Sequence, residues 1–155
     1  MRRRAAPKRD IIPDAKFNKV IITRFINYLT KDGKKSVVES AVYQSLEIME
    51  KKLKKGAIEL FNESIAKVTP KIEVRSRRMG GATYQIPVEV RPRRGSSLAL
   101  KWLKISVTKA SGRNLAEKVA NVLMDSISER SWAFKKKEEV FRMAESNKAF
   151  AHYSW

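Results

Sequence analysis

The side chains best suited to bind an anion are concentrated in the stretch VRSRRMGGATYQIPVEVRPRR, residues 74–94. The stretch surrounds one Gly-Gly pair with six arginines: Arg75, Arg77, Arg78, Arg91, Arg93 and Arg94. A guanidinium is planar and offers paired donors that match the oxygens of a phosphate. Six such groups on so short a segment indicate contact with a nucleic acid, in preference to an ordinary solvated run of charge.

The overall charge supports the same interpretation. Among 155 residues, 34 Lys and Arg stand against 16 Asp and Glu, a net charge of +18, and the pI is near 10.4. A domain that repels itself this strongly favours a polyanionic partner, and nucleic acid is the commonest one. An anionic membrane surface is the rival polyanion, but the wide polar faces of the expected helices suit it less.

The sequence does not point to catalysis or to a metal site. It contains no cysteine and one histidine, His152, so thiolate and imidazole sites are not expected. The carboxylates are dispersed apart from the pair Glu138-Glu139, and no triad is evident. We therefore expect no catalytic residue, no metal and no cofactor; a metal-dependent nuclease built from distant acids is the enzymatic alternative.

The chain has the length of one ordinary domain, and we expect a single domain over residues 1–155. Residues 1–14 predict an extended basic arm, because two prolines and little apolar content oppose a helix. Its cations are Arg2, Arg3, Arg4, Lys8 and Arg9. The alternative is a charged tail without a role. No apolar run approaches the length of a signal sequence core or a membrane span, so a cytosolic protein is expected.

Apolar periodicity predicts six helices, with three before the arginine-rich stretch and three after it. Their expected ranges are about 20–30, 36–53, 57–68, 97–108, 114–128 and 135–147. In the fourth, Ser96 or Ser97 is the expected cap, and Leu98, Trp102 and Ile105 are the expected inner face, with Trp102 in the core. Asn114 and Glu117 have the spacing of a capping box.

The arginine-rich stretch alternates polar and apolar residues on both sides of its glycines, which predicts a β-hairpin arm over residues 72–90. A two-residue turn would pair Met79 with Ala82 and mix polar and apolar residues on each face. A three-residue turn, Gly80 to Ala82, would pair Val74 with Val88 and collect apolar residues on one face. We expect the three-residue turn on this ground.

A lone hairpin is marginally stable in water, so its base is expected to lean on the helices. The side chains assigned to this contact are Ile72, Val74, Val88 and Val90. The tip carries little apolar surface and is expected to project and become ordered against a partner. A DNA-bending protein that inserts its arm into a minor groove, with Met79 as a wedge, fits this composition as well as an RNA binder does.

The last residues, 148–155, form an aromatic tail with the sequence KAFAHYSW. Its ring-bearing side chains are Phe150, His152, Tyr153 and Trp155. They suit stacking on bases or on a neighbouring protein, and they suit folding back onto the core equally well. Composition leaves both interpretations open.

Four segments together resemble one known family. They are DGKK (32–35), SRRMGGATYQIPVEVRP (76–92), LALKW (98–102) and RMAESNKAFAHYSW (142–155). In order and spacing they closely resemble the bacterial-type small-subunit ribosomal protein seven, over nearly the whole chain. The resemblance implies a mainly α fold, a domain of six helices with a protruding two-stranded antiparallel β-ribbon between the third and fourth.

The resemblance also implies a function. Members of this family are primary binders of small-subunit ribosomal RNA in the head, the 3′ major domain, and they nucleate its assembly in the cytoplasmic ribosome. They lie at the subunit interface near the exit-site transfer RNA, with messenger RNA nearby. Small-subunit ribosomal proteins nine and eleven are the neighbours that the family implies, and some members repress their own operon by binding its message.

Carried onto this chain, the resemblance implies two sets of residues. The ribosomal RNA set is Arg2, Arg3, Arg4, Lys8, Arg9, Lys34, Lys35, Arg75, Arg77, Arg78, Arg91, Arg93, Arg94, Lys101 and Arg113. The set near transfer RNA is Arg78, Met79, Gly80, Gly81, Ala82, Thr83, His152, Tyr153 and Trp155. Lys101 stands where the family usually has arginine, and a lysine binds phosphate as a point charge.

Overall fold

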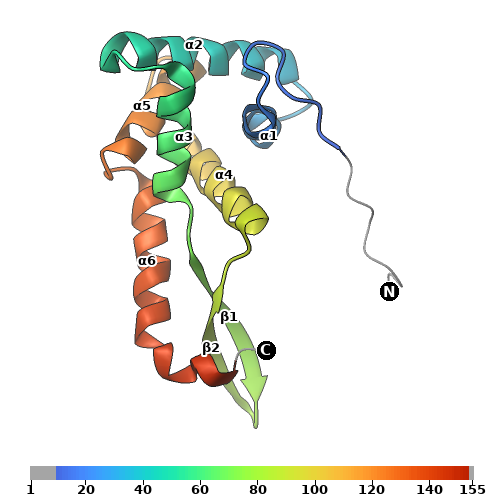
Figure 1. Cartoon of the computed structure of the whole chain (residues 1–155), viewed down its shortest axis with the longest axis vertical. Coiled ribbons are helices and arrows are strands. Elements are labelled where there is room, and N and C mark those ends of the chain that lie inside the picture. The colour runs from blue at the N-terminus through green and yellow to red at the C-terminus, as the bar shows by residue number, and fades with distance from the viewer. Residues whose placement is uncertain (1–9, 154–155) are drawn as a thin grey trace.

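The computed structural model of the chain describes residues 10–153. Along this range it contains α1 (Val20–Leu29), α2 (Lys35–Leu53), α3 (Ala57–Val68), β1 (Ile72–Met79), β2 (Ala82–Glu89), α4 (Pro92–Lys109), α5 (Leu115–Ile127), α6 (Trp132–Ser146) and the 3-10 helix η1 (Lys148–Tyr153). The predicted mainly α class, with a two-stranded ribbon between the third and fourth helices, is confirmed (Figure 1). The expected single domain over 1–155 stays a prediction.

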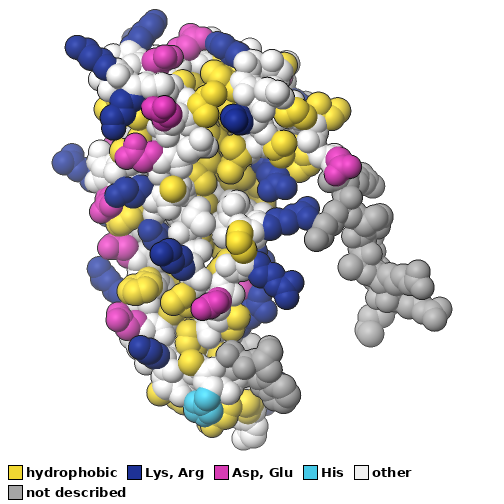
Figure 2. All heavy atoms as spheres, in the orientation of Figure 1, with side chains coloured by type: hydrophobic (Ala, Val, Ile, Leu, Met, Phe, Trp, Pro, Cys, Tyr) yellow, Lys and Arg dark blue, Asp and Glu magenta, His cyan; other side chains and the backbone are white. Residues whose placement is uncertain are grey.

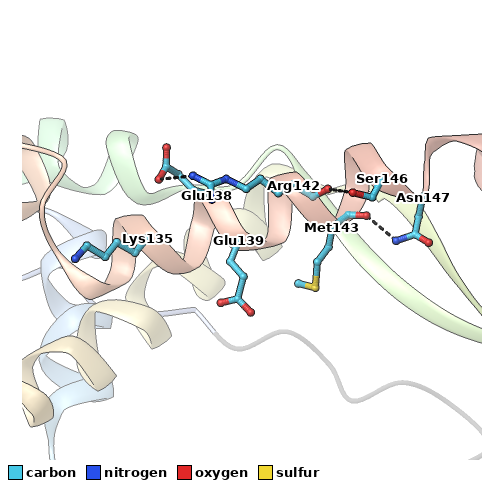
Figure 3. Close-up of a pocket in the computed structure, with 7 residues that line it drawn as sticks. All are labelled: Lys135, Glu138, Glu139, Arg142, Met143, Ser146 and Asn147. Atoms are coloured by element: carbon cyan, nitrogen blue, oxygen red, sulfur yellow. Dashed lines mark hydrogen bonds and ion pairs between the residues drawn. The ribbon is translucent and has the colours of Figure 1, made fainter.

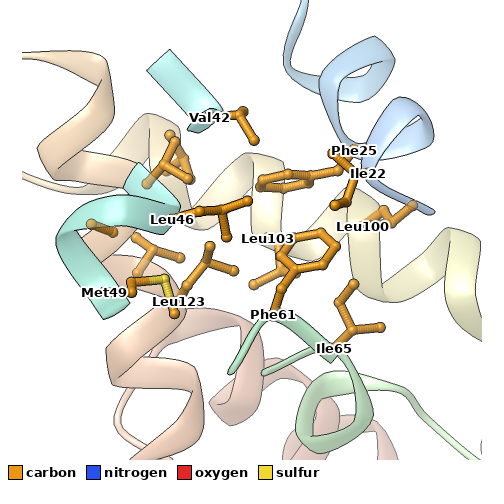
Figure 4. Packing of buried hydrophobic residues seen from close by; sticks show 14 of the residues in the cluster. Ile22, Phe25, Val42, Leu46, Met49, Phe61, Ile65, Leu100, Leu103 and Leu123 are labelled. Atoms are coloured by element: carbon orange, nitrogen blue, oxygen red, sulfur yellow. The ribbon is translucent and has the colours of Figure 1, made fainter. Parts of the chain in front are cut away.

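The helices pack around one apolar cluster, to which every α-helix contributes. Near its middle, the rings of Phe25 and Phe61 lie 5.5 Å apart and tilted, with Leu46, Leu103 and Leu123 around them (Figure 4). All five side chains are essentially inaccessible to water. Burying a side chain of this size contributes about 1.5–3 kcal/mol, so this cluster sets the relative positions of the helices.

Most helix boundaries follow the sequence prediction to within a residue or two, and α5 has the predicted cap. The Asn114 side chain accepts a hydrogen bond from the backbone N–H of Glu117 at 2.8 Å. The Glu117 carboxylate in turn accepts from the backbone N–H of Arg113 at 3.2 Å. These two bonds satisfy donors that the first turn of a helix leaves free.

Helices α4 and α6 begin earlier than predicted. Helix α4 begins at Pro92, not near Ser97, because proline needs no amide donor in a first turn and its fixed φ suits a helix. The hydroxyls of Ser96 and Ser97 cap nothing; each donates to the carbonyl four residues back. Helix α6 begins at Trp132 because the Ser131 side chain accepts from the backbone N–H of Phe134.

The inner face of α4 was also predicted wrongly. The buried side chains are Ala99, Leu100, Leu103 and Val107, whereas Leu98, Trp102 and Ile105 are half-buried. Helix α4 packs against α1, α3, α5 and α6, so it is surrounded on several sides and has more than one apolar stripe. Trp102 packs against the edge of the core and is not within it.

The hairpin has the two-residue turn, and the predicted three-residue turn is wrong. Met79 pairs with Ala82 and Val74 with Pro87. Gly80 and Gly81 have φ values of +56° and +88°. Positive φ at both central residues defines the type I′ turn, whose twist matches that of the flanking strands and which glycine adopts without steric cost.

The hydrophobic argument failed because both faces of the hairpin are partly covered at its base. Ile86 is 3 % exposed and lies opposite Arg75, while Val74 and Pro87 on the other face are half-buried. Strand β1 contacts α6, and η1 lies against β2 (Figure 1). A strand pair covered on two sides needs no single apolar face, so turn chemistry decides the register.

The type I′ turn generates a test. In Gly81→Ala the new Cβ meets no atom within 4 Å, so its effect comes from the backbone alone and is expected to weaken the hairpin by about 1–2 kcal/mol. Gly80→Asn is the control, because Asn-Gly is a preferred pair in this turn. Amide hydrogen exchange at Arg78 and Thr83 measures the pairing. Equal losses in both variants would contradict the turn type.

Candidate nucleic-acid interface

The six arginines of residues 74–94 form what we call the cationic edge. Arg75, Arg77 and Arg78 lie on β1, Arg91 caps α4, and Arg93 and Arg94 are in its first turn. Lys and Arg side chains gather between α1 and the base of the arm, over the start of α4 (Figure 2). Along α6, on the opposite edge of this view, acidic and basic side chains alternate. The fold thus concentrates cations on one side.

Glu73 organises the base of the cationic edge. The Glu73 residue is 7 % exposed. One oxygen of its carboxylate accepts Arg75 Nη2 at 2.6 Å, and the other accepts Arg94 Nε at 2.7 Å. Arg75 comes from the arm and Arg94 from α4. One buried acid therefore joins two elements and fixes the direction of two guanidiniums, both of which remain more than half exposed.

The electrostatics of Glu73 follow from these contacts. Burial acts to raise the pKa of its carboxyl, but the hydrogen bonds from Arg94 and Arg75 outweigh burial and lower the pKa below its usual range. The carboxylate is therefore charged at neutral pH. It neutralises part of the charge of two arginines and leaves their remaining donors to solvent or to a ligand.

Arg77 points toward the C-terminus, and its Nη1 donates to the backbone carbonyl of Tyr153 at 3.2 Å. Arg78 and Arg91 are exposed, and neither forms an ion pair with a residue between 10 and 153. The cationic edge therefore contains arginines with a structural contact and arginines with none inside the described chain. The second kind is the better placed to bind phosphate.

The described part of the aromatic tail, residues 148–153, lies against the arm, which does not match the expected alternative of folding back onto the core. Tyr84 of β2 lies 5.2 Å from Phe150 and 6.2 Å from Tyr153, ring centre to ring centre. His152 lies 3.9 Å from Tyr153. The tail residues assigned to the transfer RNA set, His152 and Tyr153, are thus beside the strand that leads to the tip.

The tip itself extends away from the helical core, as expected (Figure 1). Gly80, Gly81, Ala82 and Thr83 are exposed, and Met79 is half-buried. Whether the tip becomes ordered against a partner stays a prediction. The assigned Arg2, Arg3, Arg4, Lys8, Arg9 and Trp155 lie outside the described residues.

The remaining assigned cations are dispersed. Lys34 and Lys35 lie at the start of α2, and Lys101 is on an exposed side of α4. Arg113 is in the loop after α4, and the end of that helix at Lys109 lies roughly 24 Å from Arg93 at the helical rise of 1.5 Å per residue. The structure therefore does not bring Arg113 together with the cationic edge.

The segment before α1 is anchored by one carboxylate. Asp14 is 6 % exposed, accepts the backbone N–H groups of Lys16 and Phe17, and accepts the hydroxyl of Tyr43 at 2.8 Å. The same hydroxyl lies 3.0 Å from Glu39. Burial, together with these carboxylates, raises the pKa of Tyr43. Asp14 thus joins the segment before α1 to α2.

Sequence reasoning missed a polar face on α1. Arg24, Asn27 and Tyr28 line a hollow together with Ile11, Arg93 and Ser97. The spacing i, i+3, i+4 places the first three on one side of the helix and could have revealed them. It was overlooked because the same helix presents a strong apolar stripe that predicts a core element.

A second hollow runs along the outer side of α6 (Figure 3). Its charged side chains are Lys135, Glu138, Glu139 and Arg142, of which Glu138 and Arg142 approach to 3.9 Å. Two cations and two carboxylates balance each other, so this surface has no net attraction for phosphate. It serves as a natural comparison for the cationic edge.

Within 10–153 no cluster of three or more His, Cys, Asp or Glu is arranged to hold a metal ion. Within the same range no helix is both long enough and apolar enough to cross a bilayer.

Comparison with known proteins gives one consistent result. The model of the family described as ribosomal protein S7p/S5e matches residues 1–148. The small ribosomal subunit protein uS7 of Sulfurimonas denitrificans is 52 % identical over 155 residues, all of both chains. Proteins of the same name from Helicobacter hepaticus and Dichelobacter nodosus are 50 % and 51 % identical, over at least 99 % of each chain.

The ion pairs of Glu73 generate a pH test. Because the folded pKa is lowered, the stabilisation is present above the carboxyl's ordinary pKa of about 4.3 and is lost as the pH falls through the folded value. Glu73→Gln is expected to cost about 1–3 kcal/mol at pH 7, less than a fully buried pair because both arginines are half exposed.

Urea unfolding of both proteins at pH 7 and pH 3 measures this difference. The gap between wild type and Glu73→Gln should shrink at pH 3. Glu89→Gln, an exposed carboxylate on the partner strand, is the control and should stay within about 0.5 kcal/mol of wild type. Parallel pH profiles for wild type and Glu73→Gln would contradict the assigned role.

The contact between tail and arm generates a second test. Tyr84→Ser removes the ring against which Phe150 and Tyr153 pack, and aromatic pairs contribute about 0.5–1.5 kcal/mol beyond their burial. The backbone N–H of Phe150, which donates to Asn147, should then exchange severalfold faster. Thr83→Ser, a neighbouring exposed position, is the control. Unchanged exchange at Phe150 would show that Tyr84 does not hold the tail.

Proposed function

This chain belongs to the ribosomal protein S7p/S5e family and is a structural constituent of the small ribosomal subunit; from that premise we propose that its cationic edge binds ribosomal RNA of the head, the 3′ major domain, and nucleates the folding of that domain. Its place is the ribosome of the cytoplasm, and its family is a structural class without enzymatic activity. We propose accordingly that the chain catalyses no reaction and needs no cofactor.

The observation that carries the proposal is the placement of the cationic edge on two elements tied by Glu73. Arg75 on β1 and Arg94 on α4 share one carboxylate, so the arm and the helical body present guanidiniums in a fixed relation. A rigid array of phosphate contacts selects an RNA whose backbone has the matching shape. Binding energy would then stabilise one arrangement of helical junctions over others, which is how such a protein nucleates assembly.

We assign the remaining family features to the arm and the tail. The projecting tip, Arg78 to Thr83, with His152 and Tyr153 of the tail, would approach the exit-site transfer RNA at the subunit interface, with messenger RNA nearby. The packing of η1 on β2 supports a common location for these two segments. Small-subunit ribosomal proteins nine and eleven are the proposed neighbours.

The same cations would bind any RNA that reproduces the shape of the ribosomal site, which supports a further assignment. A message from the protein's own operon that folds in this way would be bound and its translation repressed. Binding to that leader RNA, competed by head-domain RNA, is the expected result. Leader binding that head-domain RNA does not displace would argue against a shared surface.

The first experiment is binding of the purified chain to isolated head-domain RNA at about 150 mM salt, competed with excess transfer RNA and duplex DNA. Binding that survives both competitors supports the assignment. If transfer RNA or duplex DNA displaces the labelled head-domain RNA as effectively as unlabelled head-domain RNA does, binding is non-specific attraction to polyanions and the proposal fails. Preference for bent duplex DNA would favour the DNA-bending alternative.

The salt dependence of binding tests the edge directly. The double variant Arg78→Gln with Arg91→Gln is expected to lower the slope of log affinity against log salt by about 1.5, since each phosphate contact contributes about 0.7–0.9. Lys135→Gln with Arg142→Gln removes the same charge from the balanced hollow on α6 and is the control. Equal slopes for both double variants would remove the cationic edge from the binding surface.

A further inference from the structure

The most specific site outside the ion-paired arginines is the hollow between α1 and α4. It is an open hollow of about 360 Å³ and is lined by Ile11, Arg24, Asn27, Tyr28, Arg93 and Ser97. Small-ligand sites in proteins begin at about 300 Å³, so the hollow has room for one small ligand and not for a helix. Its lining contains two guanidiniums, an amide, two hydroxyls and an aromatic ring, and no carboxylate.

The two guanidiniums come from different elements, Arg24 from α1 and Arg93 from α4. Arg93 and Arg94 are consecutive, yet Arg94 pairs with Glu73 while Arg93 lines the hollow together with Arg24. Neither Arg24 nor Arg93 forms an ion pair with another residue between 10 and 153. Two guanidiniums that line one hollow, with no carboxylate in its lining, favour an anion, and a phosphate can accept donors from both.

The rest of the lining suits a base. Tyr28 packs its inner edge against the apolar core, which holds its ring in place. Asn27 is exposed and lines the hollow, so its side-chain amide is accessible to a ligand, and an amide offers one acceptor and a donor side by side. An aromatic surface and an accessible amide are the pair of features that proteins use to hold an unstacked base and read its edge.

We propose that the hollow between α1 and α4 is a subsite for one unpaired nucleotide of the bound RNA. Its phosphate lies between Arg24 and Arg93, its base lies against Tyr28, and Asn27 reads the base edge. An amide complements the paired acceptor and donor of adenine best, so adenine is the preferred base. This inference rests on the proposed RNA-binding function and adds a base-specific contact to a surface that otherwise reads backbone shape.

The test uses the full chain, labelled for nuclear magnetic resonance, with the tetranucleotide r(AAAA) and an abasic tetramer that carries the same phosphates. We expect r(AAAA) to shift the Asn27 side-chain amide and the Tyr28 ring, and the abasic tetramer to bind several times more weakly. Equal affinity for the two probes, or shifts confined to the arm, would overturn the proposal, because phosphate attraction alone would then explain binding.

Substitutions test the base contact separately from the phosphate contact. Asn27→Ala should weaken r(AAAA) binding about fivefold or more, the lower end of a paired base contact, and leave the abasic tetramer unaffected. Because Asn27 is exposed, this variant should fold normally, unlike a change at Tyr28. Asn121→Ala, an exposed asparagine on α5, is the matched control. An Asn27→Ala chain that binds r(AAAA) like wild type would overturn the proposal.

The outcome separates this inference from the proposed function. Head-domain RNA that resists competition while the hollow remains unperturbed would remove the nucleotide subsite and leave the scaffold role intact. Conversely, r(AAAA) could bind specifically in the hollow while duplex DNA displaces head-domain RNA from the chain. That result would contradict the scaffold role and support the nucleotide subsite.

Discussion

The arm depends on one buried acid. A hairpin of two eight-residue strands cannot stabilise itself in water, and this one carries three arginines on a single strand. Glu73 offsets that repulsion where the arm meets the body, because its two oxygens hold Arg75 from the arm and Arg94 from α4. Without a carboxylate at this position, the arm would carry its arginines but would lose the ion pair that joins it to α4. With it, the Glu73–Arg94 ion pair joins the arm to α4, and the Glu73–Arg75 pair within β1 fixes the position of the shared carboxylate.

Single side chains also hold two other irregular segments in place. Asp14 holds the entry segment through Tyr43, and the ring of Tyr84 holds the tail. Each of these groups lies where an irregular segment meets a helix or strand. The apolar cluster around Phe25 and Phe61 makes the body rigid, but it does not by itself direct any cation. Apolar packing fixes the positions of the helices, and a few polar or aromatic side chains fix the directions of the charged segments.

Much of this could be predicted from the sequence, and the errors have physical causes. Helix positions follow from periodicity and from caps such as Asn114, and the cationic edge follows from composition. The hairpin register could not be derived by assuming one apolar face, since Ile86 is buried on one face and Val74 and Pro87 are half-buried on the other. The polar face of Arg24, Asn27 and Tyr28 was hidden by the apolar stripe of α1. The ion pairs of Glu73 depend on a contact between strand and helix that no local spacing reveals.

The order in which these contacting side chains occur along the chain matters while the protein is being synthesised. The arm comprises residues near the middle of the sequence, yet Tyr84 receives its cover from Phe150 and Tyr153, close to the carboxyl end. A chain made from its amino terminus can assemble α1 to α3 early. The aromatic side of the arm stays uncovered until Phe150 and Tyr153 have been made. Completion of the arm is therefore coupled to synthesis of a segment far later in the sequence, and a chain cut short before Phe150 would present an uncovered, strongly cationic hairpin.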